Sequence, residues 1–313
     1  MTKNLITNLP ASVHQRLLNL DPARTHDFTP VLRRYAFERW LYRLGKSDHA
    51  EEFVLKGAML FVLWTSDLPR QTMDLDLLGI GNLTETGLRR VCTKIGRMKV
   101  DPDGLIFDSD TMVVDPIREE AEFHGLRAKF IARLGNIRIP LQVDVGIGDS
   151  VWPEPEYVIY PTLLDMPAPR IRAYRKETSI AEKLDAMLDL GMLNSRMKDF
   201  YDIAVLGDRF PFNGTELLRA MKVAIKRRVL ASLTESPTAF TEEFAQDKDK
   251  NIQWGAFLRR IGQSSDSFPF PQVIAKTRNF LFPVIQALIA EKEFEEVWEP
   301  GGPWRSQEKD DDG

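Results

Sequence analysis

The stretch "RQTMDLDLLGIG", which runs from Arg70 to Gly81, decides the fold because it sets two carboxylates inside an apolar run. If this stretch is a strand, alternation places Asp74 and Asp76 on one face. The opposite, core-facing side is then expected to hold Met73, Leu75 and Leu77. Because two neighbouring carboxylates repel each other, the surrounding structure must supply something that relieves the repulsion.

A second strand region adds a third carboxylate. Residues 125–149, "GLRAKFIARLGNIRIPLQVDVGIGD", alternate apolar and polar side chains on both sides of Gly135-Asn136, which predicts a β-hairpin with a two-residue turn. In the returning strand the alternation points Asp144 away from the core. Pro140 indicates that this strand lies at an edge or contains a bulge.

Three carboxylates on neighbouring strands are well suited to a divalent cation. Magnesium binds oxygen ligands and is usually held by one or two carboxylates together with substrate phosphates. The sequence "KGA" at Lys56-Gly57-Ala58 precedes the aspartates at what reads as a turn into a helix. A glycine there allows the backbone to approach a phosphate closely, and a helix N-terminus favours an anion.

Composition restricts the class of protein. The chain has 313 residues, 43% hydrophobic and 28% charged, which is typical of a soluble protein with about two domains. Its single cysteine, Cys92, follows helical spacing and is expected in the core, so a cysteine-based metal site is excluded. Four scattered histidines give no zinc pattern. No apolar run reaches the ~18 residues that span a bilayer, and no secretory signal is recognisable, so we expect a cytoplasmic protein.

Charge is distributed unevenly along the chain. The net charge of -4 arises from the C-terminal end, where residues 288–313 hold 3 Lys and Arg against 9 Asp and Glu. Residues 166–232 hold 13 Lys and Arg against 8 Asp and Glu, including the cluster "IKRR" at residues 225–228. This cluster indicates either a surface for nucleic acid or an ordinary solvated helix face.

The remaining segments suggest helices around the strands. Residues 27–47 and 84–98 show helical spacing, and residues 52–69 read as a turn followed by a buried helix. A Pro-rich linker is expected over residues 152–170. Beyond it, Ser179 and Glu182 form a potential capping box, and Ser195 is a candidate cap for the helix containing "RMKDFYD".

Five motifs in order resemble a known family. The segments "KGA", "RQTMDLD", "VDV", "IAEKLDAM" and "RMKDFYD", spread from Lys56 to about Leu206, resemble the AbiEii/AbiGii-type nucleotidyltransferase toxins of bacterial toxin–antitoxin pairs. The resemblance implies an α+β fold: a polymerase-β-like nucleotidyltransferase domain with a small mixed or antiparallel sheet, followed by a mainly α-helical domain. It also implies Mg²⁺, with Mn²⁺ as an alternative, an NTP substrate, the 3′ end of tRNA as acceptor, an antitoxin partner and a role in abortive infection and phage defence.

The resemblance implies a role for each matching residue. Asp74 and Asp76 match the metal-binding carboxylates, and Asp144 matches the third carboxylate, which can take the proton of the attacking hydroxyl. Lys183 and Asp199 match further catalytic positions. Nucleotide binding is implied for Lys56, Gly57, Ala58, Arg70, Thr72, Lys183, Arg196, Lys198 and Asp199. The family usually has a second glycine where this chain has Ala58; alanine keeps the backbone N–H but disfavours a positive φ.

Simpler interpretations remain open for the helical motifs. Lys198 with Asp202, and Arg196 with Asp199, have the spacings of ordinary helix salt bridges. Phe200 and Tyr201 are expected in the core. We expect a helical segment over residues 1–50, the catalytic domain over 51–165, a helical domain over 166–300 and a disordered acidic tail over 301–313. Alternative functions are a transferase acting on a small molecule or protein, and a GTP-binding or NTP-binding regulator without catalysis.

Overall fold

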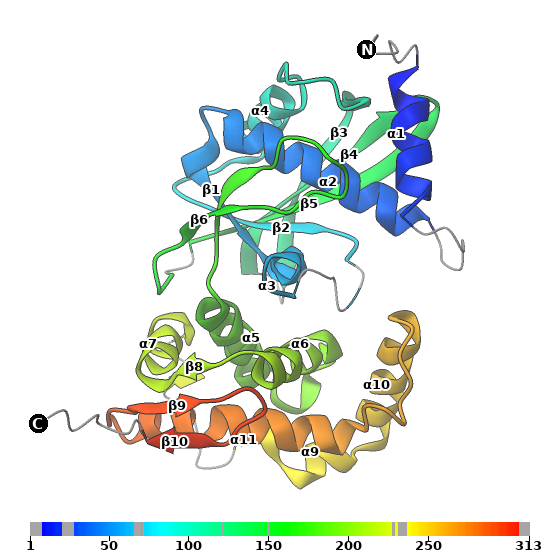
Figure 1. Ribbon diagram of the computed structural model, residues 1–313. Coiled ribbons are helices and arrows are strands. Elements are labelled where there is room, and N and C mark those ends of the chain that lie inside the picture. Colours follow the sequence, from blue (N-terminus) through cyan, green and yellow to red (C-terminus); the bar gives the residue numbers. More distant parts are fainter. Residues whose placement is uncertain are drawn as a thin grey trace, which may run out of the picture. The chain divides into compact units, whose positions relative to one another are not determined.

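The computed structural model describes residues 8–20, 28–65, 70, 72–119, 122–148, 151–226, 229–230 and 237–306 (Figure 1). The chain divides into two compact units. The sheet unit comprises Met1–Asp149 and Pro155–Tyr174, and the helical unit comprises Ser150–Glu154 and Arg175–Gly313. The division after Tyr174 lies beyond the boundary that the sequence indicated at residue 165.

The sheet unit is built around one mixed seven-stranded sheet with the order β3-β4-β5-β2-β1-β7-β6. Its strands are β1 (Phe53–Lys56), β2 (Leu75–Gly79), β3 (Leu105–Glu119), β4 (Glu122–Leu134), β5 (Ile137–Ile147), β6 (Glu156–Ile159) and β7 (Arg170–Ala173). Its helices are α1 (Leu9–Leu18), α2 (Thr29–Lys46), α3 (Phe61–Thr65) and α4 (Glu85–Gly96), with 3₁₀ turns η1 (Ala50–Glu52) and η2 (Gly57–Leu60).

The core of the sheet unit follows the alternation of its strands. Leu75 and Leu77 of β2 and Val143 and Val145 of β5 are fully buried. Helix α2 packs across β5 and β7, and α4 packs on β3 and β4 (Figure 1). Cys92 is buried in α4, as its spacing predicted. Because side chains alternate, the polar residues between these apolar ones project from the opposite face.

The predicted hairpin is present as β4 and β5, which pair from Leu134 and Ile137 outward. Pro140 is accommodated because β2 pairs with β5 only from Val143 onward, so that β5 has β4 as its ladder partner at the proline. A proline is tolerated where its missing N–H is not needed by a second neighbour.

Two local expectations in the sheet unit were wrong. The apolar run after Glu52 begins with strand β1, not with a turn, because Phe53–Lys56 pairs with both β2 and β7. The expected linker contains strand β6 and the start of β7, which form a hairpin on the sheet. Pairing decided the conformation in both cases: β1 pairs with two strands further along the chain, and β6 pairs with the next strand, β7.

The helical unit contains α5 (Lys176–Leu190), α6 (Met197–Arg209), α7 (Gly214–Ala224), α9 (Glu242–Gln246), α10 (Lys248–Arg260) and α11 (Phe270–Ile289), with η3 (Gly191–Leu193) and η4 (Thr238–Phe240). A three-stranded sheet, β10-β9-β8, is formed by β8 (Phe212–Asn213), β9 (Glu296–Trp298) and β10 (Trp304–Ser306). The core of the helical unit includes Phe200 and Tyr201, as predicted. Their rings contact other aromatic rings.

Three expectations about segment ends differ from the structure. Helix α5 begins at Lys176, so Ser179 and Glu182 lie inside it and form no capping box. Helix α6 begins after Arg196, and Asn194 rather than Ser195 accepts from the backbone N–H there. Strand β10 lies within the segment expected to be disordered; residues 307–313, and Arg227 and Arg228 of the basic cluster, lie outside the described residues.

Candidate active site

The three aspartates of the sheet unit converge. Strands β2 and β5 are parallel neighbours whose register places Asp76 directly opposite Asp144. Asp74 precedes the first residue of β2, and one ligand oxygen from each of the three carboxylates lies within 4.8 Å of the other two. All three side chains are partly exposed. A group of oxygen ligands that remains open to solvent fits a hard divalent cation.

Gly57 shapes the site through its backbone. Its φ is +73°, and a β-carbon there would lie 2.0 Å from Oδ2 of Asp76. Only glycine therefore allows the turn after β1 to lie against this carboxylate. Lys56 is the cross-strand partner of Asp76, and its Nζ lies 5.7 Å from the centre of the Tyr174 ring. Ala58 is buried in η2.

The residues just before β2 orient Asp74. Thr72 Oγ1 lies 2.9 Å from Oδ1 of Asp74 and 3.1 Å from its carbonyl oxygen, so the hydroxyl can donate to either. Arg70 lies in a bend before this segment and is partly exposed. The expectation for Met73 was wrong: β2 begins at Leu75, and the Met73 side chain is exposed.

One residue of the site was missed from the sequence. The Arg127 guanidinium donates from Nε to Oδ1 of Asp144 at 2.9 Å and from Nη2 to Oδ2 at 2.7 Å. The hydrogen bond to Asp144 raises the pKa of Arg127, and the charges of Asp74 and Asp76 add to this effect. Counting back from the Gly135-Asn136 turn pairs Arg127 with Asp144, so the predicted hairpin already contained this signal.

The remaining predicted residues form a second charged cluster inside the helical unit. Lys183 Nζ of α5 lies 2.8 Å from both Asp199 and Asp202 of α6, and Arg196 Nε lies 2.7 Å from Asp199. The expected pair of Arg196 with Asp199 is thus present. Asp199 is 1% exposed, and both of its oxygens accept hydrogen bonds from these cations. Lys198, in contrast, has an exposed side chain.

The cluster keeps Asp199 ionised. Burial alone would raise the pKa of this carboxyl, but the positive charges of Lys183 and Arg196 outweigh burial and lower the pKa to about 2. A buried carboxylate with a cation at each oxygen is an electrostatically complete arrangement. It differs from the site at β2 and β5, where three carboxylates face one another.

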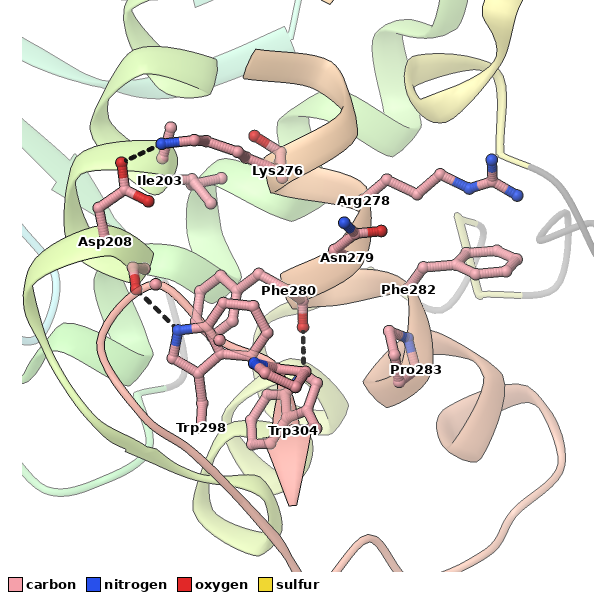
Figure 2. Close-up of a pocket in the computed structure, with 16 residues that line it drawn as sticks. Ile203, Asp208, Lys276, Arg278, Asn279, Phe280, Phe282, Pro283, Trp298 and Trp304 are labelled. Carbon is pink, nitrogen blue, oxygen red and sulfur yellow. Dashed lines mark hydrogen bonds and ion pairs between the residues drawn. The ribbon is translucent and has the colours of Figure 1, made fainter. Parts of the chain in front are cut away.

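A cavity of about 610 Å³ also lies within the helical unit, between α6, α11 and the loop joining β9 to β10. Figure 2 shows its tryptophan indoles turned to the backbone: Trp298 donates to the Gly207 carbonyl and Trp304 to the Phe280 carbonyl. Lys276 pairs with Asp208 at its rim. Arg278 and Asn279 also line the cavity, but Asp208 is the one acidic residue among the described residues of its lining. Because these lining residues bring together no group of carboxylates, the aspartate cluster is the stronger candidate for metal-dependent chemistry.

Comparisons with known proteins identify a family. The sequence model described as "Nucleotidyl transferase AbiEii toxin, Type IV TA system" matches residues 39–295, well beyond the five motifs noted above. No curated protein matches the chain. Solved structures similar to the chain include JHP933 from Helicobacter pylori, at 14% identity and TM-score 0.48, covering 84% of this chain and 92% of that one.

Another similar structure is MenT4, a nucleotidyltransferase toxin from Mycobacterium tuberculosis, at 16% identity and TM-score 0.48. It covers 89% of this chain and 98% of that one. The family match extends over more than half of the chain and includes every residue of both charged clusters. The chain therefore belongs to the AbiEii nucleotidyltransferase toxin family and is a nucleotidyltransferase of a toxin–antitoxin system.

Proposed function

We propose that this toxin uses Mg²⁺ to transfer nucleotides from an NTP to the 3′ end of tRNA, and so blocks translation and growth. The observation that supports the chemistry best is the convergence of Asp74, Asp76 and Asp144 within 4.8 Å. Nucleotidyltransferases generally use a divalent metal ion and an NTP, and family membership implies a cognate antitoxin.

Asp74, Asp76 and Asp144 would hold the ions. All their ligand atoms are carboxylate oxygens, the donor type that Mg²⁺ prefers, and their partial exposure leaves room for phosphate oxygens. Bound divalent ions supply charge neutralisation and align the attacking and leaving oxygens. Three carboxylates in such proximity repel one another by several kcal/mol at an effective dielectric constant of ~20, which favours cation binding.

The residues of the chain then have distinct tasks. Asp144 accepts the proton of the acceptor hydroxyl while the oxygen of that hydroxyl forms a bond to the α-phosphorus. The bond from that phosphorus to the bridging oxygen breaks, and pyrophosphate leaves. The turn at Gly57 and Ala58 binds phosphate oxygens through backbone N–H groups, and Lys56 supplies positive charge. Thr72 orients Asp74, and Arg70 contacts the nucleotide.

The assignment of Lys183, Arg196, Lys198 and Asp199 to nucleotide binding stays a prediction based on the resemblance. For Asp199 the geometry supports a structural role, because both oxygens already accept hydrogen bonds from cations of the same unit. Lys198 is the most informative of the four, since its side chain is exposed, and its charge contributes only a smaller part of the lowering of the Asp199 pKa.

Transfer to tRNA is favoured over a small acceptor by the positive balance of residues 166–232. Neutralising phosphates with Lys and Arg makes binding weaken steeply with salt. Transfer to a small molecule or a protein would show little salt dependence.

The test is incubation of the toxin with each labelled NTP, Mg²⁺ and total tRNA, followed by separation of RNA, protein and small molecules. We expect label on the tRNA 3′ end, loss of label with EDTA or with Asp74→Asn, and reduced labelling at high salt. Labelled protein or small molecules without labelled RNA would replace tRNA as the acceptor. Retention of full labelling by Asp74→Asn would overturn the proposed metal site.

A further inference from the structure

Arg127 has the contacts of a residue that holds a catalytic carboxylate in place. It lies on β4 directly opposite Asp144 on β5, and its guanidinium fork meets both carboxylate oxygens. Gln142 Nε2 adds a third contact, to Oδ2, at 3.2 Å. Two donors in a rigid planar fork determine the rotation of a carboxylate as well as its position.

The three contacts leave Asp144 able to bind a further group. Oδ2 accepts from both Arg127 and Gln142, whereas among the described residues Oδ1 accepts only from Arg127. A carboxylate oxygen has two lone-pair sites, so Oδ1 keeps acceptor capacity. Arg127 therefore orients Asp144 without using all of its acceptor sites.

We propose that Arg127 is a positioning residue, which holds Asp144 in the rotamer that completes the metal site with Asp74 and Asp76. The inference rests on the proposed function, since it needs Asp144 to be a metal ligand. Arg127 itself contacts neither substrate nor metal in this proposal, and its positive charge opposes cation binding. If orientation of Asp144 dominates, removing Arg127 weakens metal binding. If the positive charge dominates, removing Arg127 strengthens metal binding.

The same sheet contains a matched control. Arg133 lies six residues further along β4, on the same face as Arg127, and donates from Nε and Nη2 to Oδ2 of Asp108 on β3. The two arginines are similarly exposed, at 35% and 37%. Asp108 is not part of the aspartate group that can hold a metal. Arg133→Met thus removes a similar ion pair from the same strand without affecting the site.

The experiment measures Mn²⁺ binding by calorimetry for wild type, Arg127→Met, Arg127→Lys and Arg133→Met, with urea unfolding of each. We expect Arg127→Met to weaken Mn²⁺ binding about 10-fold, in the range for loss of a group that orients a metal ligand. Arg127→Lys keeps the charge but loses the fork, so binding stays weakened. Arg133→Met should bind like wild type, with a similar change in unfolding midpoint.

Mn²⁺ binding by Arg127→Met that equals or exceeds that of wild type would overturn the positioning role while leaving the proposed function intact. If wild type binds no Mn²⁺, the proposed metal site fails, and the positioning role fails with it. A second readout is the transfer reaction: Arg127→Met should lower kcat about 10- to 100-fold, with the KM for NTP unchanged. A rise in that KM with kcat retained would also overturn positioning.

Discussion

The two charged clusters of this toxin show opposite electrostatic designs. In the sheet unit, oxygens of Asp74, Asp76 and Asp144 lie within 4.8 Å of one another and are partly exposed. In the helical unit, the carboxylates of Asp199 and Asp202 are at most 1% exposed, and each faces a cation. In the first cluster Arg127 pairs with Asp144, and the three carboxylates together fit an added cation. In the second, a cation of the same unit already lies against each oxygen of Asp199. Proximity of charged residues alone therefore does not identify a catalytic site.

The largest expected effect is on catalysis at the first cluster. Asp76→Asn removes one of the three carboxylates proposed to bind the metal ions. We expect nucleotidyl transfer to fall about 1,000-fold. Transfer of label from the NTP measures this effect, and urea unfolding checks that the variant is folded.

Asp108→Asn serves as the control for Asp76→Asn, because Asp108 is a paired carboxylate of the same sheet outside the cluster. Its transfer rate should stay within a few-fold of wild type. A comparable loss of transfer in both variants would show that the loss in Asp76→Asn is not specific to the aspartate cluster.

Substitutions in the helical cluster should mainly lower the free energy of unfolding. Lys183→Met leaves Asp199 and Asp202 buried without their shared ammonium, and we expect the free energy of unfolding to fall by about 3 kcal/mol or more. Lys276→Met breaks the exposed pair with Asp208 and should change it by less than ~1 kcal/mol. Equal urea midpoints for the two variants would contradict the structural role.

Acid should weaken the helical cluster in a defined pH range. Because the pKa of Asp199 is lowered from 3.8 to about 2, its ionised form stabilises the fold above its unfolded-state pKa. This contribution is lost as the pH falls through about 2, and amounts to about 2 kcal/mol. Between about pH 5 and pH 2, wild type should therefore lose that much more stability than Asp199→Asn. Parallel stability curves would show that Asp199 has no such coupling.

The smallest expected effect comes from two glycine substitutions, which distinguish the cost of backbone strain from an effect on the aspartate cluster. Gly57→Ala and Gly81→Ala both place alanine at a positive φ, which costs about 1–2 kcal/mol. Only at Gly57 would the new β-carbon meet Asp76, while at Gly81 no atom lies within 4 Å. We expect Gly57→Ala to lose more stability than Gly81→Ala, because its β-carbon clashes with Asp76 in addition to adopting a positive φ, and we expect only Gly57→Ala to lose transfer activity. Equal activities would remove Gly57 from the site.

Local sequence patterns predicted secondary structure correctly where the periodicity of apolar side chains determines it. The alternation in residues 125–149 predicted the hairpin, and helical spacing predicted α2 and the buried Cys92. They failed at β1, whose partners β2 and β7 lie further along the chain, at the β6–β7 hairpin, and at the start of α5. Among the described residues, no helix is long and apolar enough to cross a membrane.

The sequence by itself determined the candidate carboxylates, the order of the family motifs and the alternation that turns Asp76 and Asp144 away from the core. Only the tertiary structure decided that β5 lies parallel to β2 in the register that brings these aspartates together. It also decided that Lys183 and Asp199 are buried with each other. The reason is that strand pairing and helix packing join residues far apart in the chain, and their free energy depends on the whole core rather than on any local segment.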